Sequence, residues 1–216
     1  NSKKPVKNCS NIHGTFIEEV KKNKKVKEFK IPSDEYNRLL IIKSSLQNTF
    51  PEYFVLNRLK EDFKKLKLDL SDYYIISVQH LLRSTGSLFE ALIDIGFNAN
   101  KIYLTGKIYS THKETEKFLE EDLGIHIFKS TDDEPLGKYS NGLNKVIAKM
   151  WESLLKDINP KSKIIVLDDG GYTLKSVSAE LLKRHTIYGV EQTTSGIKES
   201  ESFEKFPIID VAASAT

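Results

Sequence analysis

The sequence predicts an α/β fold: an open, doubly wound, mostly parallel sheet of the Rossmann-like or flavodoxin-like kind, preceded by helices. Two observations predict it. From residue 73 onward, short apolar runs alternate with segments of helical periodicity, which is typical of β-α-β units whose strands are buried on both faces. Four of these apolar runs also pass directly into polar residues, as expected where strands end at the ligand-binding edge of such a sheet.

About six strands are expected, and helices separate most of them. The strands are predicted at residues 73–79, 101–107, 125–129, 163–169, 186–192 and 206–211. The helices are predicted at residues 84–96, 112–124, 143–158 and 173–184, with a polar loop at 130–142. Because crossovers between parallel strands are right-handed, the helices should cover both faces of the sheet.

Two amphipathic helices should precede the sheet. The first opens with the helix-start residues Pro32, Ser33 and Asp34, and the second covers residues 52–68. The apolar residues of the second helix are expected to face mostly inward: Phe54, Leu56, Leu59, Phe63 and Leu66. Residues 1–32 are lysine-rich and weakly periodic, so we assign them as an extension and residues 33–216 as one domain.

Composition excludes several classes of protein. No apolar run approaches the roughly 20 residues of a membrane helix, so no membrane segment is expected. The single Cys9 excludes an internal disulfide and a cysteine-based zinc site, which indicates a reducing, cytoplasmic compartment and no metal. Net charge is only +3, and the lysine cluster at 21–30 lacks interleaved aromatics. A solvated segment is therefore favoured over a nucleic-acid-binding arm.

The segment KIIVLDDGGYTLKSV (163–177) joins an apolar strand to two aspartates and two glycines. Asp168 and Asp169 have two interpretations. They could cap the helix that follows, or they could place a carboxylate at the edge of a parallel sheet where such folds bind ligands. This segment alone leaves both open.

The other expected strand ends are also polar, and together they predict a small-molecule pocket at one edge. No glycine-rich nucleotide loop is present, because neither DDGG nor STGS has the required spacing. The side chains expected to converge are His80, Ser84, Thr85, Ser110, Thr111, His112, Asp169, Glu191, Gln192, Thr193, Thr194 and Ser195.

Several of these segments occur in the order seen in one known family. VLDDGGYT is followed by GVEQTTSGIKE and then by FPIIDVAASAT, and ISVQHLLRSTGSLFEAL and KIYLTGKIYSTHKE precede them. Over roughly residues 73–216 the chain resembles the substrate domain of the S-adenosylhomocysteine hydrolase (adenosylhomocysteinase) family. The resemblance implies an NAD-dependent hydrolase that acts on a nucleoside thioether or a related small molecule.

The resemblance also implies roles for individual residues. His80 and Asp169 would be the catalytic acid–base pair, and Asp168 would be a structural cap. Substrate contacts would come from Ser84, Thr111, His112, Glu191 and Gln192, and contacts to NAD from Thr193, Thr194 and Ser195. The three hydroxyl residues are equally compatible with a helix-start cap.

The chain departs from the family at positions that hold the nucleoside. Leu82 and Ser84 replace a threonine and a glutamate, Gln192 replaces a glutamate, and Tyr172 replaces an aspartate. An Asn-Asp pair before the hinge is replaced by two alanines, at 212 and 213. We therefore expect weak or no binding of adenosine itself.

Two classes of function remain open. One is an enzyme domain with an altered substrate, with most of the NAD contacts coming from a further domain expected after Thr216. The other is a non-catalytic relative that binds a ligand or a partner chain with a degenerate site. An unrelated flavodoxin-like domain is a third, less specific interpretation. The family forms homo-oligomers, but we expect a monomer or a weak dimer from these residues.

Overall fold

A computed structural model describes residues 53–129, 139–200 and 206–212. They all belong to one compact unit, Phe50–Thr216. The expected N-terminal extension, the helix expected at 32–50, the boundary at 32/33, Cys9 and Ala213 lie outside the described residues.

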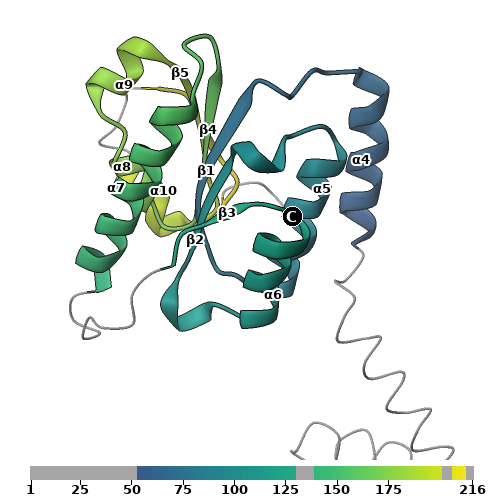
Figure 1. The fold of residues 1–216 in the computed structure, drawn as a ribbon, viewed down its shortest axis with the longest axis horizontal. Helices are drawn as coiled ribbons and strands as arrows, with labels where there is room; N and C mark the ends of the chain where they lie inside the picture. The colour runs from purple at the N-terminus through teal and green to yellow at the C-terminus, as the bar shows by residue number, and fades with distance from the viewer. Residues whose placement is uncertain (1–52, 130–138, 201–205, 213–216) are drawn as a thin grey trace, which may run out of the picture. The chain divides into compact units, whose positions relative to one another are not determined.

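The described strands form one six-stranded sheet in the order β3-β2-β1-β4-β5-β6. Every neighbouring pair is parallel (Figure 1). The bounds are β1 Tyr73–Gln79, β2 Ile102–Gly106, β3 His126–Ile127, β4 Lys163–Asp168, β5 Thr186–Glu191 and β6 Ile208–Asp210. The order reverses between β1 and β4, which is the Rossmann-like arrangement. The predicted fold class is therefore confirmed, with every described strand parallel.

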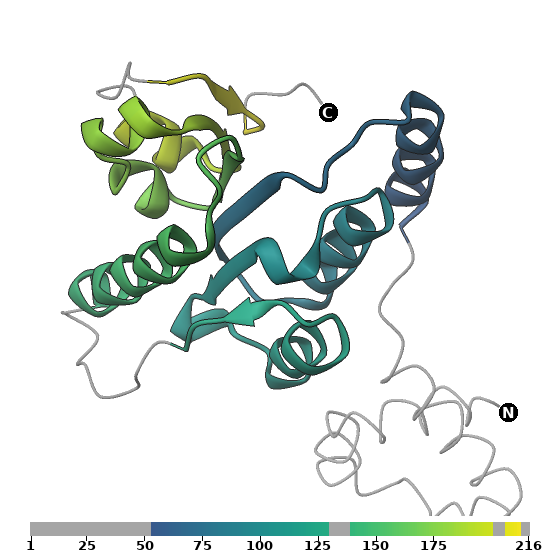
Figure 2. The same ribbon diagram turned by 45° about the horizontal axis from the view of Figure 1, so that its top comes forward.

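Helices cover both faces of this sheet (Figures 1 and 2). Helices α5 (Arg83–Asp94) and α6 (Lys113–Lys117) lie on one face. On the other face lie α7 (Tyr139–Asp157), α8 (Tyr172–Lys175), α9 (Ala179–Arg184) and α10 (Thr194–Ser200). Helix α4 (Phe54–Leu66) contacts α5. Short turns complete the chain: η1 (Ala99–Lys101), η2 (Ile108–Ser110) and the π-helical turn η3 (Phe118–Asp122).

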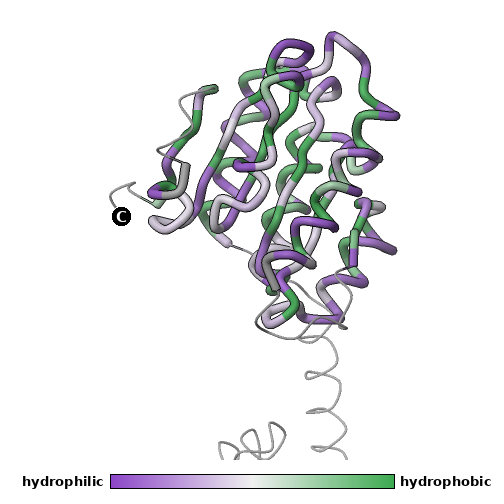
Figure 3. Tube along the Cα trace, turned by 90° about the vertical axis from the view of Figure 1, so that its left-hand side faces the viewer, coloured by the Kyte–Doolittle hydropathy of each residue, from purple (hydrophilic) through white to green (hydrophobic). Residues whose placement is uncertain are grey.

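Two hydrophobic clusters, one on each face, form the core. Alternate residues of β1 point to opposite faces, so Tyr74, Ile76 and Val78 pack with α7 while Ile75 packs with α5. Figure 3 shows that hydrophobic residues concentrate along the strands. Burial on both faces explains why the strands read as continuous apolar runs.

The single helix predicted at 173–184 is wrong, because the structure has two short helices there. Ser176 donates its hydroxyl to the carbonyl oxygen of Thr173 at 2.6 Å, and the side chain of Ser178 accepts from the N–H of Leu181. Serine hydroxyls that bond to nearby main-chain groups compete with helical hydrogen bonds. The chain therefore ends α8 and starts α9 with a new cap. The helix predicted at 112–124 is likewise divided into α6 and η3.

The expected inward packing of α4 is wrong for most of its apolar residues. Phe54 and Leu66 are 78% and 61% exposed, and Leu59 is also exposed. Phe63 and Leu56 are half-buried, and Phe63 packs against the core beneath α5. The periodicity of the sequence predicted the apolar face of α4 but could not show how much of that face another helix would cover.

His185, at the end of α9, should make the stability of the domain depend on pH. It is buried, and neither ring nitrogen has a hydrogen-bond partner among the described residues. Burial, assisted by the neighbouring charge of Arg184, lowers the pKa of His185 below its ordinary value of 6.5. The unfolded chain thus binds a proton more readily than the folded one, so the free energy of unfolding should fall as pH drops below about 6.5.

Urea unfolding across that pH range measures the effect. His185→Phe should remove part of the pH dependence, whereas the exposed His126→Gln should leave it unchanged. Equal pH dependence in the parent and in His185→Phe would contradict the assignment.

None of the helices in the described residues combines the length and the apolar character needed to cross a membrane.

Candidate functional site

The register of the sheet brings three strand ends together at the point where the strand order reverses. Gln79 of β1 pairs with Gly106 of β2, and Val78 pairs with Asp168 of β4. The residues that follow these three strands are His80, Lys107 and Asp169. Since parallel strands end at the same edge, these side chains meet at the topological switch point between β1 and β4.

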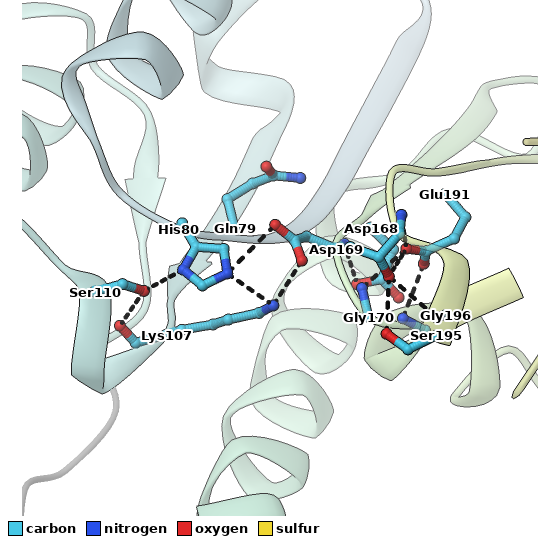
Figure 4. A network of polar contacts seen from close by, with 12 residues as sticks. Gln79, His80, Lys107, Ser110, Asp168, Asp169, Gly170, Glu191, Ser195 and Gly196 are labelled. Atoms are coloured by element: carbon cyan, nitrogen blue, oxygen red, sulfur yellow. Dashed lines mark hydrogen bonds and ion pairs between the residues drawn. The ribbon is translucent and has the colours of Figure 1, made fainter. Parts of the chain in front are cut away.

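His80, Lys107 and Asp169 form one polar group, which we call the switch-point triad (Figure 4). Lys107 Nζ lies 2.6 Å from Asp169 Oδ1, and His80 Nε2 lies 3.6 Å from Asp169 Oδ2. Lys107 Nζ also lies 3.3 Å from His80 Nε2. The side chains are 33%, 5% and 13% exposed for His80, Lys107 and Asp169 respectively. The triad is thus mostly withdrawn from water but reachable through His80.

The other ring nitrogen of His80 faces Ser110. His80 Nδ1 lies 2.5 Å from Ser110 Oγ, and Ser110 Oγ donates to the carbonyl oxygen of Lys107 at 3.4 Å. If the hydroxyl hydrogen is used in that bond, Nδ1 of His80 must supply the hydrogen to Ser110 Oγ. Turn η2, which carries Ser110, therefore orients the imidazole with Nε2 toward Asp169.

Asp168 is a structural residue, as predicted. It is fully buried, and it accepts hydrogen bonds from the N–H groups of Asp169, Thr173 and Leu174 at 2.9, 2.6 and 2.9 Å. The adjacent aspartates thus have separate tasks: Asp168 holds the start of α8, and Asp169 points into the triad. Burial raises the pKa of Asp168 to about 7; the charge of Glu191 acts in the same direction, and the three N–H groups oppose it.

Glu191 has a structural position rather than an open, ligand-facing one. Its carboxylate is fully buried and accepts from the N–H groups of Gly170, Gly171 and Thr193 at 2.9, 2.8 and 2.7 Å, and from the Thr193 hydroxyl at 2.7 Å. A Cβ on Gly196 would overlap this carboxylate. Glu191 therefore locks the turn after β4 to the turn after β5, and it places Asp169 indirectly.

Other predicted site residues have their contacts away from the side chains of His80 and Asp169. Ser84 is exposed on α5. His112 pairs with Glu114 at 2.9 Å at the start of α6, and Thr111 donates to the carbonyl oxygen of Lys107 at 2.9 Å. Gln192 is half-buried beside the carbonyl of Asp168, to which its N–H donates at 3.1 Å. The structure therefore brings His80 and Asp169 together but shows none of these four in contact with either side chain.

The hydroxyl residues assigned to NAD begin α10. The Thr193 hydroxyl donates to Glu191 and accepts from the N–H of Gly196 at 3.0 Å, so Thr193 is a helix cap. Thr194 and Ser195 are exposed, and Ser195 donates to the Thr193 hydroxyl at 3.3 Å. Both hydroxyls are therefore accessible from solvent. They do not fit a dinucleotide carried by this sheet, because the turn after β1 lacks the glycines that admit a pyrophosphate.

Sequence reasoning missed Lys107. A lysine after a strand usually indicates that the strand end is exposed to solvent. The pocket was therefore predicted instead from the polar residues that come later, Ser110, Thr111 and His112. A signal was present, because Lys107 directly follows Gly106 at a predicted strand end, in the same position as His80 and Asp169.

A groove of about 620 Å³ lies between α7, α8 and α9, and its lining does not include the triad. Trp151 and Tyr172 line it, and Trp151 is the single tryptophan of the chain. Lys107 Nζ lies 5.7 Å from the centroid of the Tyr172 ring, so Tyr172 both lines the groove and contacts the triad. Among the described residues, no group of histidine, cysteine and carboxylate side chains is arranged to hold a metal ion.

Comparison with known proteins gives two relatives without an assigned activity. No family model matches the chain. The chain is 27% identical over 153 residues to Uncharacterized protein MT0113 of Mycobacterium tuberculosis (strain CDC 1551 / Oshkosh) and to Uncharacterized protein Rv0104 of M. tuberculosis (strain ATCC 25618 / H37Rv). The match covers 68% of this chain but 30% of each relative. The adenosylhomocysteinase resemblance therefore stays a prediction.

Proposed function

We propose that the described unit is the substrate-binding domain of an adenosylhomocysteinase-like, NAD-dependent protein that acts on a nucleoside thioether or a related small molecule. The observation that supports it most is the meeting of His80 and Asp169, 3.6 Å apart, at the switch point of the sheet. In open α/β sheets this is where ligands bind. A histidine and a carboxylate in contact are also a common pair for proton transfer.

In this proposal the two side chains divide the work. His80 is the more exposed and would meet the ligand, while Asp169 would take part in proton transfer at a ligand hydroxyl. NAD would supply the hydride acceptor, with Thr194 and Ser195 facing it from the start of α10. We place the protein in the cytoplasm because of its single cysteine.

A non-catalytic, ligand-binding relative is the second candidate. Leu82, 47% exposed beside His80, is apolar where the family has a hydroxyl, and the half-buried Gln192 has no charge. Each lost hydrogen bond to a charged group weakens nucleoside binding by about 2 kcal/mol. A site with the triad but without those anchors could hold a ligand and not turn it over.

Ligand binding by the domain tests the proposal. Calorimetry measures the binding of three ligands: S-adenosylhomocysteine, the same thioether with inosine in place of adenosine, and adenosine. The fluorescence of Trp151 reports whether a ligand binds close to Tyr172. We expect a thioether to bind the parent and the matched control His126→Gln, with adenosine much weaker. His80→Gln should lower the affinity for the thioether at least about tenfold, or roughly 1.4 kcal/mol. Absence of thioether binding, or binding that ignores His80, would overturn the proposal.

A further inference from the structure

Lys107 has no part in the function proposed above, yet it is the most buried member of the triad. Its main chain is fixed on both sides. Its N–H donates to the carbonyl of Gln79 at 3.0 Å, and its carbonyl accepts from the N–H of Ser110 at 3.0 Å and from Thr111 Oγ1 at 2.9 Å. The side chain is therefore directed toward the switch point from a rigid attachment.

Two side chains lie within hydrogen-bonding distance of the Lys107 ammonium, and an aromatic ring lies close to it. An ammonium has three donors. One faces Asp169 Oδ1 at 2.6 Å, one faces His80 Nε2 at 3.3 Å, and the charge lies over the Tyr172 ring, 5.7 Å from its centroid. Aromatic faces attract such cations. The ammonium is surrounded by the Asp169 carboxylate, the His80 imidazole and the Tyr172 ring. Its position is therefore fixed by protein groups rather than by solvent.

The turn after β4 leaves room for this arrangement. Gly170 has a φ of +102°, and a Cβ there would lie 2.9 Å from Tyr172 Cε2 and 3.6 Å from Lys107 Nζ. A side chain at position 170 would thus displace the Tyr172 ring and crowd the ammonium. Gly170 permits both the left-handed turn and the contact between Tyr172 and Lys107.

We propose that Lys107 is the positioning residue of the switch-point triad: it aligns Asp169 and holds His80 as the tautomer protonated on Nδ1. An ammonium N–H that points at Nε2 requires a lone pair there, and a proton on Nε2 would face that donor. Ser110 Oγ lies against Nδ1 and can accept a hydrogen bond from the N–H that the ring then carries there. The ring is thereby set with Nε2 as the acceptor of the Lys107 ammonium. The role of this tautomer in catalysis rests on the function proposed above, whereas the tautomer itself does not.

Nitrogen-15 NMR of histidine-labelled domain tests the inference without any ligand. The His80 signals are assigned with His80→Gln, and the shifts of the two ring nitrogens identify which one is protonated. We expect the Nδ1–H tautomer in the parent. Lys107→Met should move the proton to Nε2, facing Asp169, and Lys107→Arg should restore the parent pattern because its guanidinium supplies N–H donors again. Lys163→Met is the matched control, because Lys163 also lies over a tyrosine ring, 5.0 Å from the centroid of Tyr73.

Two results would overturn the inference: an Nε2–H tautomer in the parent, or an unchanged Nδ1–H tautomer in Lys107→Met. If Lys107→Met does not fold, the double variant Lys107→Met/Asp169→Asn replaces it, because this variant removes both charges. The double variant should lose the preference for the Nδ1–H tautomer. If it keeps that preference, the inference is overturned. Because no ligand is used, a failure here is distinguishable from a failure of His80-dependent binding.

Discussion

Under the proposed function, Asp169→Asn is expected to lower turnover by about 10²–10⁴-fold, the usual contribution of a general acid or base. The asparagine oxygen can still accept a hydrogen bond from Lys107, so the side chain keeps its place. It loses the charge that holds the ammonium and the capacity to exchange a proton. Turnover is measured as reduction of NAD when S-adenosylhomocysteine or its inosine counterpart is added.

The fold should survive this change. We expect a loss of roughly 1–3 kcal/mol in the free energy of unfolding, because a charged hydrogen bond to a buried lysine is weakened but not removed. Asp72→Asn is the matched control: Asp72 is an exposed aspartate at the opposite end of β1, paired with Lys101 at 3.7 Å. Turnover in Asp169→Asn equal to that of the parent would show that the triad is not catalytic and that the segment LDDGG serves as a strand end with a helix cap.

Asp168→Asn is expected to have the larger effect on stability, with a loss of about 2–5 kcal/mol in the free energy of unfolding. Both carboxylate oxygens of Asp168 accept main-chain N–H groups, one from Asp169 and two from the start of α8. Asparagine has one acceptor, so its NH₂ group must face a buried donor. Each unsatisfied buried donor costs about 1–3 kcal/mol, and the clash adds to it.

The stability difference between the parent and Asp168→Asn should also depend on pH. Burial raises the pKa of Asp168 from 3.8 to about 7, so the folded chain holds this proton more tightly than the unfolded chain does. Between those values the folded state carries more protons, and the contribution of Asp168 to stability falls as pH rises. The parent's advantage over Asp168→Asn should therefore be largest in acid and should shrink toward pH 7. Urea unfolding of both proteins across this range measures it, and an advantage that grows with pH would contradict the assignment.

The two neighbouring aspartates thus separate stability from chemistry. Asp168→Asn should unfold more easily, and Asp169→Asn should remain folded and lose activity. The opposite pattern would mean that the strand-end carboxylates were assigned in the wrong order.

The sequence by itself determined the fold class and much of the layout of the sheet. Strands buried on both faces must be apolar along their whole length, and this local property was visible between residues 73 and 191. The bounds of β1 agree with the prediction, and β4 and β5 each end one residue earlier than predicted. This segment alone left the roles of Asp168 and Asp169 open, and the family resemblance implied the division that the structure shows for Asp168.

The structure alone decided how the polar residues are used. Lys107 and Asp169 are 62 residues apart in the chain, and the sheet register brings them to 2.6 Å. Glu191 was predicted to contact substrate, but the register of β5 against β4 places it beside two glycine N–H groups, and its carboxylate is satisfied there. The single helix expected at 173–184 divides because serine hydroxyls bond locally to the main chain. Periodicity records which residues are apolar, whereas hydrogen bonds between distant residues depend on which strand ends become neighbours. The tertiary fold decides which strand ends become neighbours.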